Sequence, residues 1–330
     1  MPLSPELLTF LTTSPPKQAW TAISDYLWGQ FSAPMTSTNL IAEIVRRDKD
    51  LNEIENVLSG SGWELWNDFE NCIPKASTSL VEFWDAPTDG RAILILDGLS
   101  LRESSWLLTE ATRRGYKIVQ GGCRGSELPA ETTPFAKALG FPQRSALEND
   151  EAGSSHKLPG AFTACSNLPW KDCVDIIGAQ KACVFWHHWP DERMHELSGP
   201  GQGLRMLALE THTGLTSDDF WKFIERLANG RRLVITGDHG YAACGEFHDL
   251  SGDQSTYMKK VFKNGRSAET TGEDTPFVPP IDLAITSVHG PYQYVLGRRK
   301  WKGQSGYPTL QHGGLSLMEM FVPFLEIRKY

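Results

Sequence analysis

Two parts of the chain place an aspartate and a histidine where predicted elements begin or end. Asp238 and His239 follow the buried strand predicted over 233–236, and open α/β sheets bind ligands at the carboxyl ends of their strands. Asp191 and His195 are four residues apart, so one helical turn would put both side chains on one face. Carboxylate oxygen and imidazole nitrogen suit zinc or manganese. These residue types and spacings therefore predict a metal-dependent site.

Further candidates of the same chemical types lie at other element ends. Asp97 ends the continuous apolar strand predicted over 92–96, although it could instead cap the helix that follows. His312 precedes a predicted helix near the end of the chain and is the last candidate ligand. His187 and His188 lie at the end of another predicted strand, and for these two we expect packing or support of the site.

A nucleophile is predicted at the start of a short helix. Thr132 stands where backbone N–H groups and the helix dipole favour an anionic oxygen, which suits a hydroxyl that attacks as an alkoxide. Thr133 is the alternative nucleophile. Threonine is also a favoured helix cap, so a purely structural role for this position stays open.

The composition is that of an ordinary soluble globular protein. Of the 330 residues, 40% are hydrophobic and 22% charged, and the net charge of -8 argues against indiscriminate binding to nucleic acid. We find no apolar run that could span a bilayer and no basic segment typical of a signal peptide. The six cysteines include no CxxC pair, so we expect reduced thiols in a cytoplasmic protein.

Hydrophobic patterning predicts an α/β fold: a doubly wound, mostly parallel sheet flanked by helices. Residues 1–85 read as an N-terminal helical region, and 86–330 as the catalytic domain, with a cap insertion expected at 141–180. A strand, helix and strand between 92 and 120 indicate a right-handed parallel unit. Further elements are predicted as helices at 216–227 and 254–263, strands at 182–186, 280–287, 292–297 and 322–327, and a helix reaching residue 320 from about 311.

A basic run near the C-terminus could contact a polyanionic substrate. Four of the five positions 298–302 are basic in a protein that is acidic overall; they are Arg298, Arg299, Lys300 and Lys302. We expect them to hold the non-reacting part of a phosphate-containing substrate. A solvated strand edge guarded by cations is the alternative.

Three sequence segments resemble those of a known family. The segments ILILDGLS, VITGDHGY and HGGLSLMEMFVPFLEI are similar to those of the PglZ-type domain, a branch of the alkaline phosphatase superfamily found in bacterial phage-defence systems and in some signalling proteins. The resemblance covers about residue 88 to the C-terminus. It departs from the family pattern around the nucleophile, where this chain has Pro-Ala-Glu-Thr-Thr.

The resemblance implies a site with two divalent metal ions, zinc being favoured and manganese the alternative. It implies a hydrolase that acts on phosphodiesters, such as nucleotides or oligonucleotides, with other defence proteins as partners and no membrane. Alternatives are a phosphomonoesterase or phosphomutase, and a non-catalytic, metal-stabilised subunit of a defence complex. By the same resemblance one metal would be held by Asp191, His195 and His312, and the other by Asp97, Asp238 and His239, with the Thr132 hydroxyl directed toward the substrate.

Overall fold

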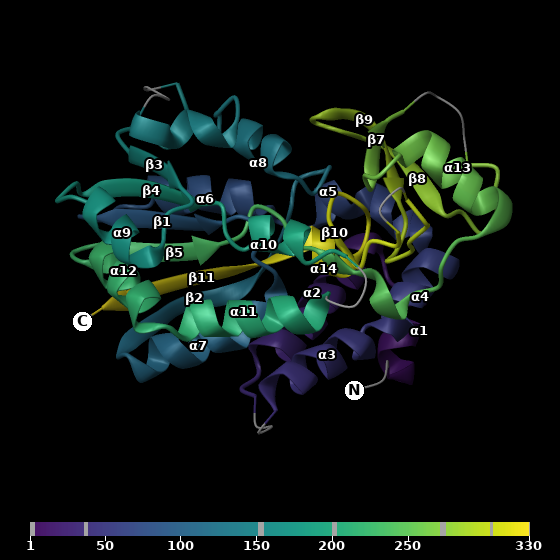
Figure 1. Ribbon diagram of the computed structural model, residues 1–330, viewed down its shortest axis with the longest axis horizontal. Helices are drawn as coiled ribbons and strands as arrows, with labels where there is room; N and C mark the ends of the chain where they lie inside the picture. The colour runs from purple at the N-terminus through teal and green to yellow at the C-terminus, as the bar shows by residue number, and fades with distance from the viewer. Residues whose placement is uncertain are drawn as a thin grey trace.

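A six-stranded central sheet organises the computed structural model, in which residues 4–35, 39–150, 155–199, 203–270, 275–303 and 306–329 are described (Figure 1). The strand order is β2-β11-β5-β1-β4-β3. Its strands are β1 (Arg91–Leu96), β2 (Tyr116–Gly125), β3 (Phe162–Ser166), β4 (Ala182–His187), β5 (Arg232–Thr236) and β11 (Phe321–Lys329). The apolar runs predicted as strands thus form the middle of the sheet.

The sheet is mostly parallel. Strands β5, β1, β4 and β3 pair in parallel, whereas β11 is antiparallel to both of its neighbours, β5 and β2. The α/β fold class predicted from the sequence is confirmed. The strands β1 and β2 are not neighbours in the sheet, because β5 and β11 lie between them.

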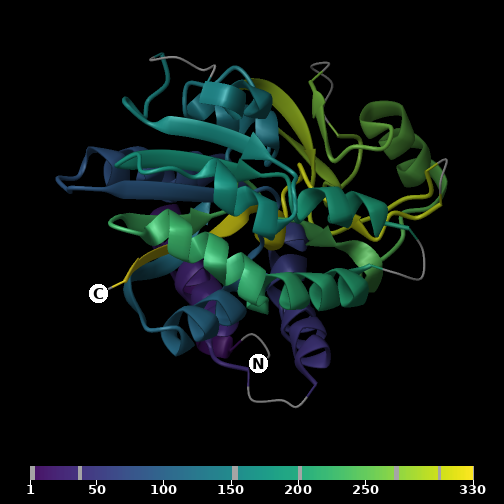
Figure 2. The same ribbon diagram turned by 60° about the vertical axis from the view of Figure 1, so that its left-hand side comes forward.

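Helices cover both faces of the sheet, as Figures 1 and 2 show. Alternate strand residues face opposite ways, so Leu94 and Ile235 pack on one helical layer, and Ile93 and Val234 on the other. The first layer contains α7 (Ser104–Arg113), α9 (Trp170–Cys173), α11 (Leu204–Thr216) and α12 (Asp218–Ala228); the second contains α6 (Ala76–Asp85) and α8 (Thr132–Ala138).

Every element that the structure describes before β1 is helical. Trp20 and Trp66 are fully buried, and their ring centroids lie 4.8 Å apart. Their cluster includes Phe321 at the start of β11, so these helices pack against the sheet. They are α1 (Pro5–Thr13), α2 (Pro16–Ser32), α3 (Leu40–Asp50), α4 (Asn52–Gly60), the 3-10 turn η1 (Trp63–Asp68) and α5 (Phe69–Cys72).

A smaller antiparallel sheet lies beside the large one. Its order is β7-β9-β8, formed by β7 (Ser267–Glu269), β8 (Asp282–Ser287) and β9 (Gly290–Val295). Figure 1 shows it next to α13 (Gly252–Phe262). The remaining elements are β6 (Ala242–Ala243), β10 (Leu310–Gln311), α10 (Asp191–Glu196), α14 (Leu317–Met320), and the 3-10 turns η2 (Leu101–Glu103), η3 (Arg144–Asp150), η4 (Val174–Ile176) and η5 (Cys244–Glu246).

Three sequence-based boundaries need correction. Within the segment 141–180, Phe162–Ser166 form β3 and pair with β4, whereas Leu147 and Leu158 pack on one face of the sheet. The helix expected at 216–227 begins at Asp218, because the Ser217 side chain accepts the N–H of Phe220 and caps it. The helix expected up to residue 320 is only the short α14. No helix among the described residues has both the length and the apolar character needed to cross a bilayer.

Candidate metal centre

The sheet topology brings the candidate ligands to one edge. Asp97 follows β1, Asp191 begins α10 after β4, and Asp238 follows β5. His312 reaches the same edge because β11 runs antiparallel and the chain approaches its start from that side. Thr132 arrives there after β2. Residues far apart in sequence are therefore close in space because they share the carboxyl edge of the sheet.

Backbone contacts hold the loops of this edge together. The N–H of Asp97 donates to the carbonyl of His187 at 2.9 Å, and the N–H of Asp191 donates to the carbonyl of Asp97 at 3.0 Å. Gly98 has a φ of +72° and donates its N–H to Asp238 Oδ1 at 3.0 Å. A side chain at Gly98 would be strained and would lie 3.2 Å from the Asp191 Cβ. The Asp97-Gly98 pair thus positions Asp191 through the Asp97 carbonyl and Asp238 through the Gly98 N–H.

The first group of ligands has the spacing of a metal site. His195 Nε2 lies 3.3 Å from Asp191 Oδ2 and 3.3 Å from His312 Nε2, and His312 Nε2 lies 3.7 Å from Asp191 Oδ1. Two nitrogens bound at about 2.0–2.1 Å to a tetrahedral zinc ion lie roughly 3.3 Å apart. The three side chains therefore fit one such cation.

The second group surrounds Thr132. His239 Nε2 lies 3.4 Å from Asp97 Oδ1 and 3.6 Å from Asp238 Oδ2. The Thr132 hydroxyl oxygen lies 3.3 Å from Asp97 Oδ1 and 3.4 Å from His239 Nε2. Asp191 also offers an oxygen to Asp97 and His239, so its carboxylate lies between the two groups. A second cation would thus have a hydroxyl beside it.

Hydrogen bonds orient two of the imidazoles. His239 Nδ1 lies 2.9 Å from the carbonyl of Gly240, and His312 Nδ1 lies 3.3 Å from that of Ala130. A neutral imidazole that donates from Nδ1 leaves the lone pair of Nε2 free to bind a metal. The rings of His239 and His312 stack with centroids 4.1 Å apart. This stacking directs the Nε2 atoms of both rings toward the carboxylates.

Two buried carboxylate oxygens lack a hydrogen-bond donor. Asp191 Oδ1 and Asp238 Oδ2 have no partner among the described residues, although leaving a buried charge unpaired is costly. Burial, helped by the charge of Asp97, raises the pKa of Asp238 to about 7. Burial would lower the pKa of His239, but the charges of Asp238 and the other carboxylates raise it instead. The site therefore requires positive charge, and divalent cations fit that requirement.

Arg144 is a site residue that the sequence analysis missed. Its guanidinium contacts Asp97 Oδ2 from η3, and its side chain is one quarter exposed. The sequence predicts a cap insertion over 141–180, and no spacing or motif connects position 144 with position 97. The contact arises because η3 packs against β3 and β4. Arg144 therefore places a cationic group on the Asp97 carboxylate that the Thr132 hydroxyl also approaches.

The cap alternatives for the acidic and hydroxyl residues do not hold. In α8 the N-cap position is Glu131 and no side chain makes a cap hydrogen bond, so Thr132 is free to face Asp97. The turn after Asp97 is capped by Ser100. The imidazoles of His187 and His188 bond to other groups than the ligands: His187 lies against the Leu168 carbonyl, and His188 contacts Cys165 and Glu192, as expected for supporting residues.

The basic run is mostly internal, contrary to the expectation that it binds substrate. Arg298 is fully buried and pairs with Asp48 at 2.7 Å. Arg299 donates to the carbonyls of Pro280 and Leu296, and Lys300 is 8% exposed and bonds the carbonyl of Cys244. These three cations neutralise or bind groups inside the protein, because a long basic side chain can fold back as readily as it can extend. Lys302 is exposed.

A pocket of about 480 Å³ adjoins the first ligand group. His195 and His312 form part of its wall, and Trp301, Tyr307 and Lys263 also line it. It combines aromatic surface with cationic groups. The sequence analysis did not identify it, because its walls come from four separate parts of the chain, from Glu131 to His312.

Comparisons with known proteins place few constraints on the chain. Neither protein-family models nor curated protein sequences give a match. Among solved structures, the chain is similar to murine ectonucleotide pyrophosphatase/phosphodiesterase 5, with 12% identity over 73% of this chain and 88% of that one, and a TM-score of 0.45. An inactive variant of that protein in complex with AMP gives 14% identity over 72% and 88%, also with a TM-score of 0.45. Both likenesses are too remote to assign a family.

Proposed function

We propose that this protein is a metal-dependent phosphoesterase of the alkaline phosphatase superfamily that hydrolyses phosphodiesters through Thr132. One observation carries the proposal: the Thr132 hydroxyl lies 3.3 Å from Asp97 and 3.4 Å from His239 Nε2, inside a set of Asp and His side chains with metal-ligand spacing. A hydroxyl in such a set is suited to attack phosphorus. The motif resemblance to PglZ-type domains supports the same reaction.

The two ligand groups would hold separate cations. Asp191, His195 and His312 would hold one divalent cation, and Asp97, Asp238 and His239 the other. The bound cations would neutralise phosphate oxygens and favour the ionised form of the nucleophile. Mixed Asp and His ligands favour zinc or manganese over magnesium.

The chain's own residues supply the remaining steps. The Oγ1 of Thr132 loses its proton to solvent and forms a bond to phosphorus, while the bond from phosphorus to the leaving oxygen breaks and that oxygen takes up a proton. Water then cleaves the phosphothreonine ester and restores the hydroxyl. Arg144, released from Asp97 when a cation binds there, would pair with a non-bridging phosphate oxygen.

The pocket beside His195 and His312 favours a diester over a simple monoester. Its volume of about 480 Å³ accommodates an organic substituent, and Trp301 and Tyr307 offer surface on which a nucleobase could stack. A nucleotide or short oligonucleotide is therefore the substrate class we favour. A role in phage defence is proposed on the motif resemblance alone, and a cytoplasmic location on the cysteine pattern alone.

Chromogenic esters test this proposal. Protein treated with a chelator should not hydrolyse bis(p-nitrophenyl) phosphate, and zinc or manganese should restore turnover. The diester should be cleaved faster than p-nitrophenyl phosphate. Preference for the monoester would favour the phosphatase or mutase alternative. No turnover of either ester by the metal-loaded protein would favour a non-catalytic subunit.

A further inference from the structure

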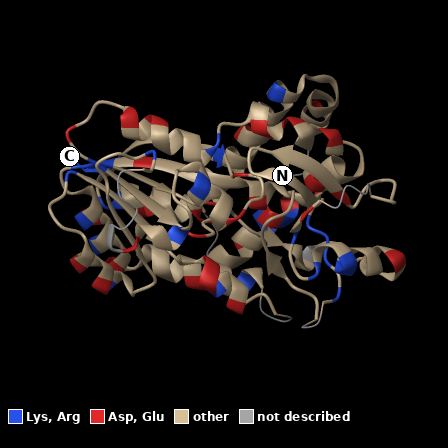
Figure 3. Ribbon diagram, turned by 90° about the horizontal axis from the view of Figure 1, so that it is seen from above, with Lys and Arg blue, Asp and Glu red and all other residues tan. Residues whose placement is uncertain are grey.

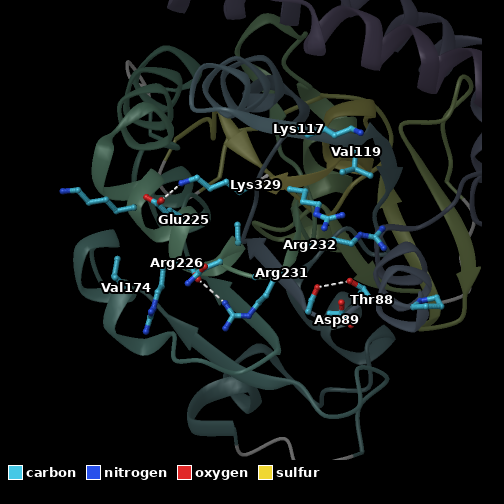
Figure 4. A pocket seen from close by; sticks show the side chains of 17 residues that line it. Thr88, Asp89, Lys117, Val119, Val174, Glu225, Arg226, Arg231, Arg232 and Lys329 are labelled. Carbon is cyan, nitrogen blue, oxygen red and sulfur yellow. Dashed lines mark hydrogen bonds and ion pairs between the residues drawn. The ribbon is translucent and has the colours of Figure 1, made fainter.

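A second large pocket lies at the opposite edge of the central sheet (Figure 4). Its volume is about 1230 Å³, and its walls include the start of β5, the start of β2 and the end of β11. Arg232 in this pocket and Asp238 in the metal centre are six positions apart, which corresponds to about 20 Å along a strand. The pocket is therefore separate from the metal centre.

Basic side chains dominate this pocket although the protein is acidic overall. Seven lysines and arginines line it, against two carboxylates, Asp89 and Glu225, in a chain of net charge -8. Figure 3 shows basic segments close to the C-terminal end of β11. A local excess of this kind is not explained by composition, and it produces a positive potential in a hollow where the field is focused.

The strongest observation is a pair of like charges on neighbouring strands. Lys117 of β2 and Arg328 of β11 are direct partners in the antiparallel register, so their side chains lie on the same face. Both are exposed. Neither side chain forms an ion pair or hydrogen bond with another residue that the structure describes. Like charges directly opposite each other are destabilising, and a bound anion would remove the repulsion.

Two other cations of the pocket are held in place without a carboxylate, whereas Lys222, Arg232 and Lys329 pair with the carboxylates of Asp219, Glu326 and Glu225. Arg226 donates to the carbonyl of Ile177 at 2.6 Å, and Arg231 donates to several carbonyls, including that of Gln180 at 2.7 Å. Carbonyl groups order these guanidiniums and leave their charge uncompensated. The dashed lines of Figure 4 mark the contact between Arg231 and Arg226, and the ion pair between Lys329 and Glu225. The pocket thus combines ordered cations with two mutually repelling ones.

We propose that this pocket binds the phosphate groups of a polyanion, with Lys117 and Arg328 as the principal contacts. Its volume exceeds what a single phosphate fills, and its cations extend over three strands and α12, so several phosphates fit better than one. Such a ligand could be a free polyphosphate or nucleotide, or the backbone of a nucleic acid, since all present the same oxygens. The inference does not depend on the proposed hydrolytic activity.

The test is binding to the full chain with Thr132→Ala, after chelation, so that the metal centre neither cleaves nor holds the probe. Fluorescence anisotropy would follow a labelled single-stranded DNA, with inorganic tripolyphosphate as an unlabelled competitor. The pocket variant is Lys117→Gln/Arg328→Gln. The matched control is Lys259→Gln/Lys260→Gln, which removes the same charge from exposed positions on α13.

We expect the pocket variant to weaken binding by about tenfold and to lower the salt slope by roughly 1.4, since each lost contact to a single strand contributes about 0.7. The control should bind as the parent does. Competition by tripolyphosphate at concentrations comparable to those of DNA phosphate would identify a free polyphosphate as the preferred ligand; weak competition would identify the nucleic-acid backbone. Equal affinity of both variants, or no binding of either probe, would overturn the proposal.

Hydrolysis of a small chromogenic diester, measured in the same variants with Thr132 intact, separates this inference from the proposed function. The pocket variant should keep parental turnover, because its substitutions are about 20 Å from the metal centre. Loss of DNA binding with unchanged hydrolysis supports both statements. A parent protein without hydrolysis that still binds DNA through Lys117 and Arg328 would contradict the proposed function alone.

Discussion

The Nε2 atoms of His195 and His312 lie 3.3 Å apart, although 117 positions separate the two residues in the sequence. Both ring nitrogens approach the Asp191 carboxylate. Two imidazoles that direct their Nε2 atoms at one point beside a carboxylate are arranged for a shared cation. The relationship depends on β4 ending, and β11 beginning, at the same edge of the sheet.

Replacement of Asp191 should affect both ligand groups. Asp191→Asn removes one negative charge from a side chain that approaches His195, His312 and His239. We expect bound metal to fall and kcat/KM for a diester to drop by about 100-fold or more. Metal analysis by mass spectrometry and steady-state kinetics would measure this. Glu192→Gln, next in sequence and half exposed, is the control and should change neither quantity.

The two adjacent threonines should differ sharply. Thr132→Ala should keep parental metal content and lose turnover, because Thr132 faces Asp97 and His239. Thr133 is exposed, so Thr133→Ala should retain most activity. Kinetics of both variants with equal metal content decide the assignment. An inactive Thr133→Ala beside an active Thr132→Ala would reverse it.

Arg144→Leu tests the guanidinium beside Asp97. If Arg144 binds phosphate in the metal-loaded protein, its loss should raise KM for a diester by about tenfold, the equivalent of roughly 1.4 kcal/mol. Metal content should stay constant or rise, since the guanidinium competes with a cation for Asp97. A fall in metal content with unchanged KM would assign Arg144 to the structure of the site instead.

Arg298 should matter for stability and not for substrate binding. It pairs with buried Asp48, which also pairs with Arg102. Arg298→Met should lower the free energy of unfolding by about 3 kcal/mol, because it removes one partner of a buried charge network. Urea denaturation would measure the loss. Lys302→Met, at an exposed position of the same run, should have little effect on stability.

Glu55 gives stability a pH dependence. Burial raises its pKa to about 7, with Arg298 opposing the shift. Between the unfolded pKa of about 4.3 and this value the native chain keeps a proton that the unfolded chain releases, so stability falls as pH rises through that window. Glu55→Gln cannot ionise, and its stability relative to the parent should therefore increase from pH 5 to pH 8, by on the order of 2 kcal/mol. Glu64→Gln, at an exposed position, should show no such trend.

Much of the fold could be predicted because buried strands have a strong local signature. The apolar runs ending in Asp97 and Gly237 form β1 and β5, and the residues after them lie at the ligand edge as expected. The partners of β2 could not be predicted, because strand order depends on which faces the helices cover and not on the strand's own residues. The sequence also carries no signal for the position of β11 between β5 and β2.

The candidate site shows the same division. Asp191 and His195 could be paired from their spacing within one helix. Arg144 could not be found, because its contact with Asp97 spans 47 positions and depends on how η3 packs. The prediction that the basic run binds substrate was wrong for a related reason. The sequence shows that four cations lie close together, but only the fold shows that Arg298 pairs with Asp48.

Metal titration with paired activity measurements tests the central claim most directly. Chelated protein would be titrated with zinc while bound metal and hydrolysis of bis(p-nitrophenyl) phosphate are followed together. The account expects two bound ions per chain at saturation, turnover that appears only as the second ion binds, and loss of both in Asp238→Ala. Full turnover by the metal-free protein, or by Asp238→Ala without bound zinc, would contradict it.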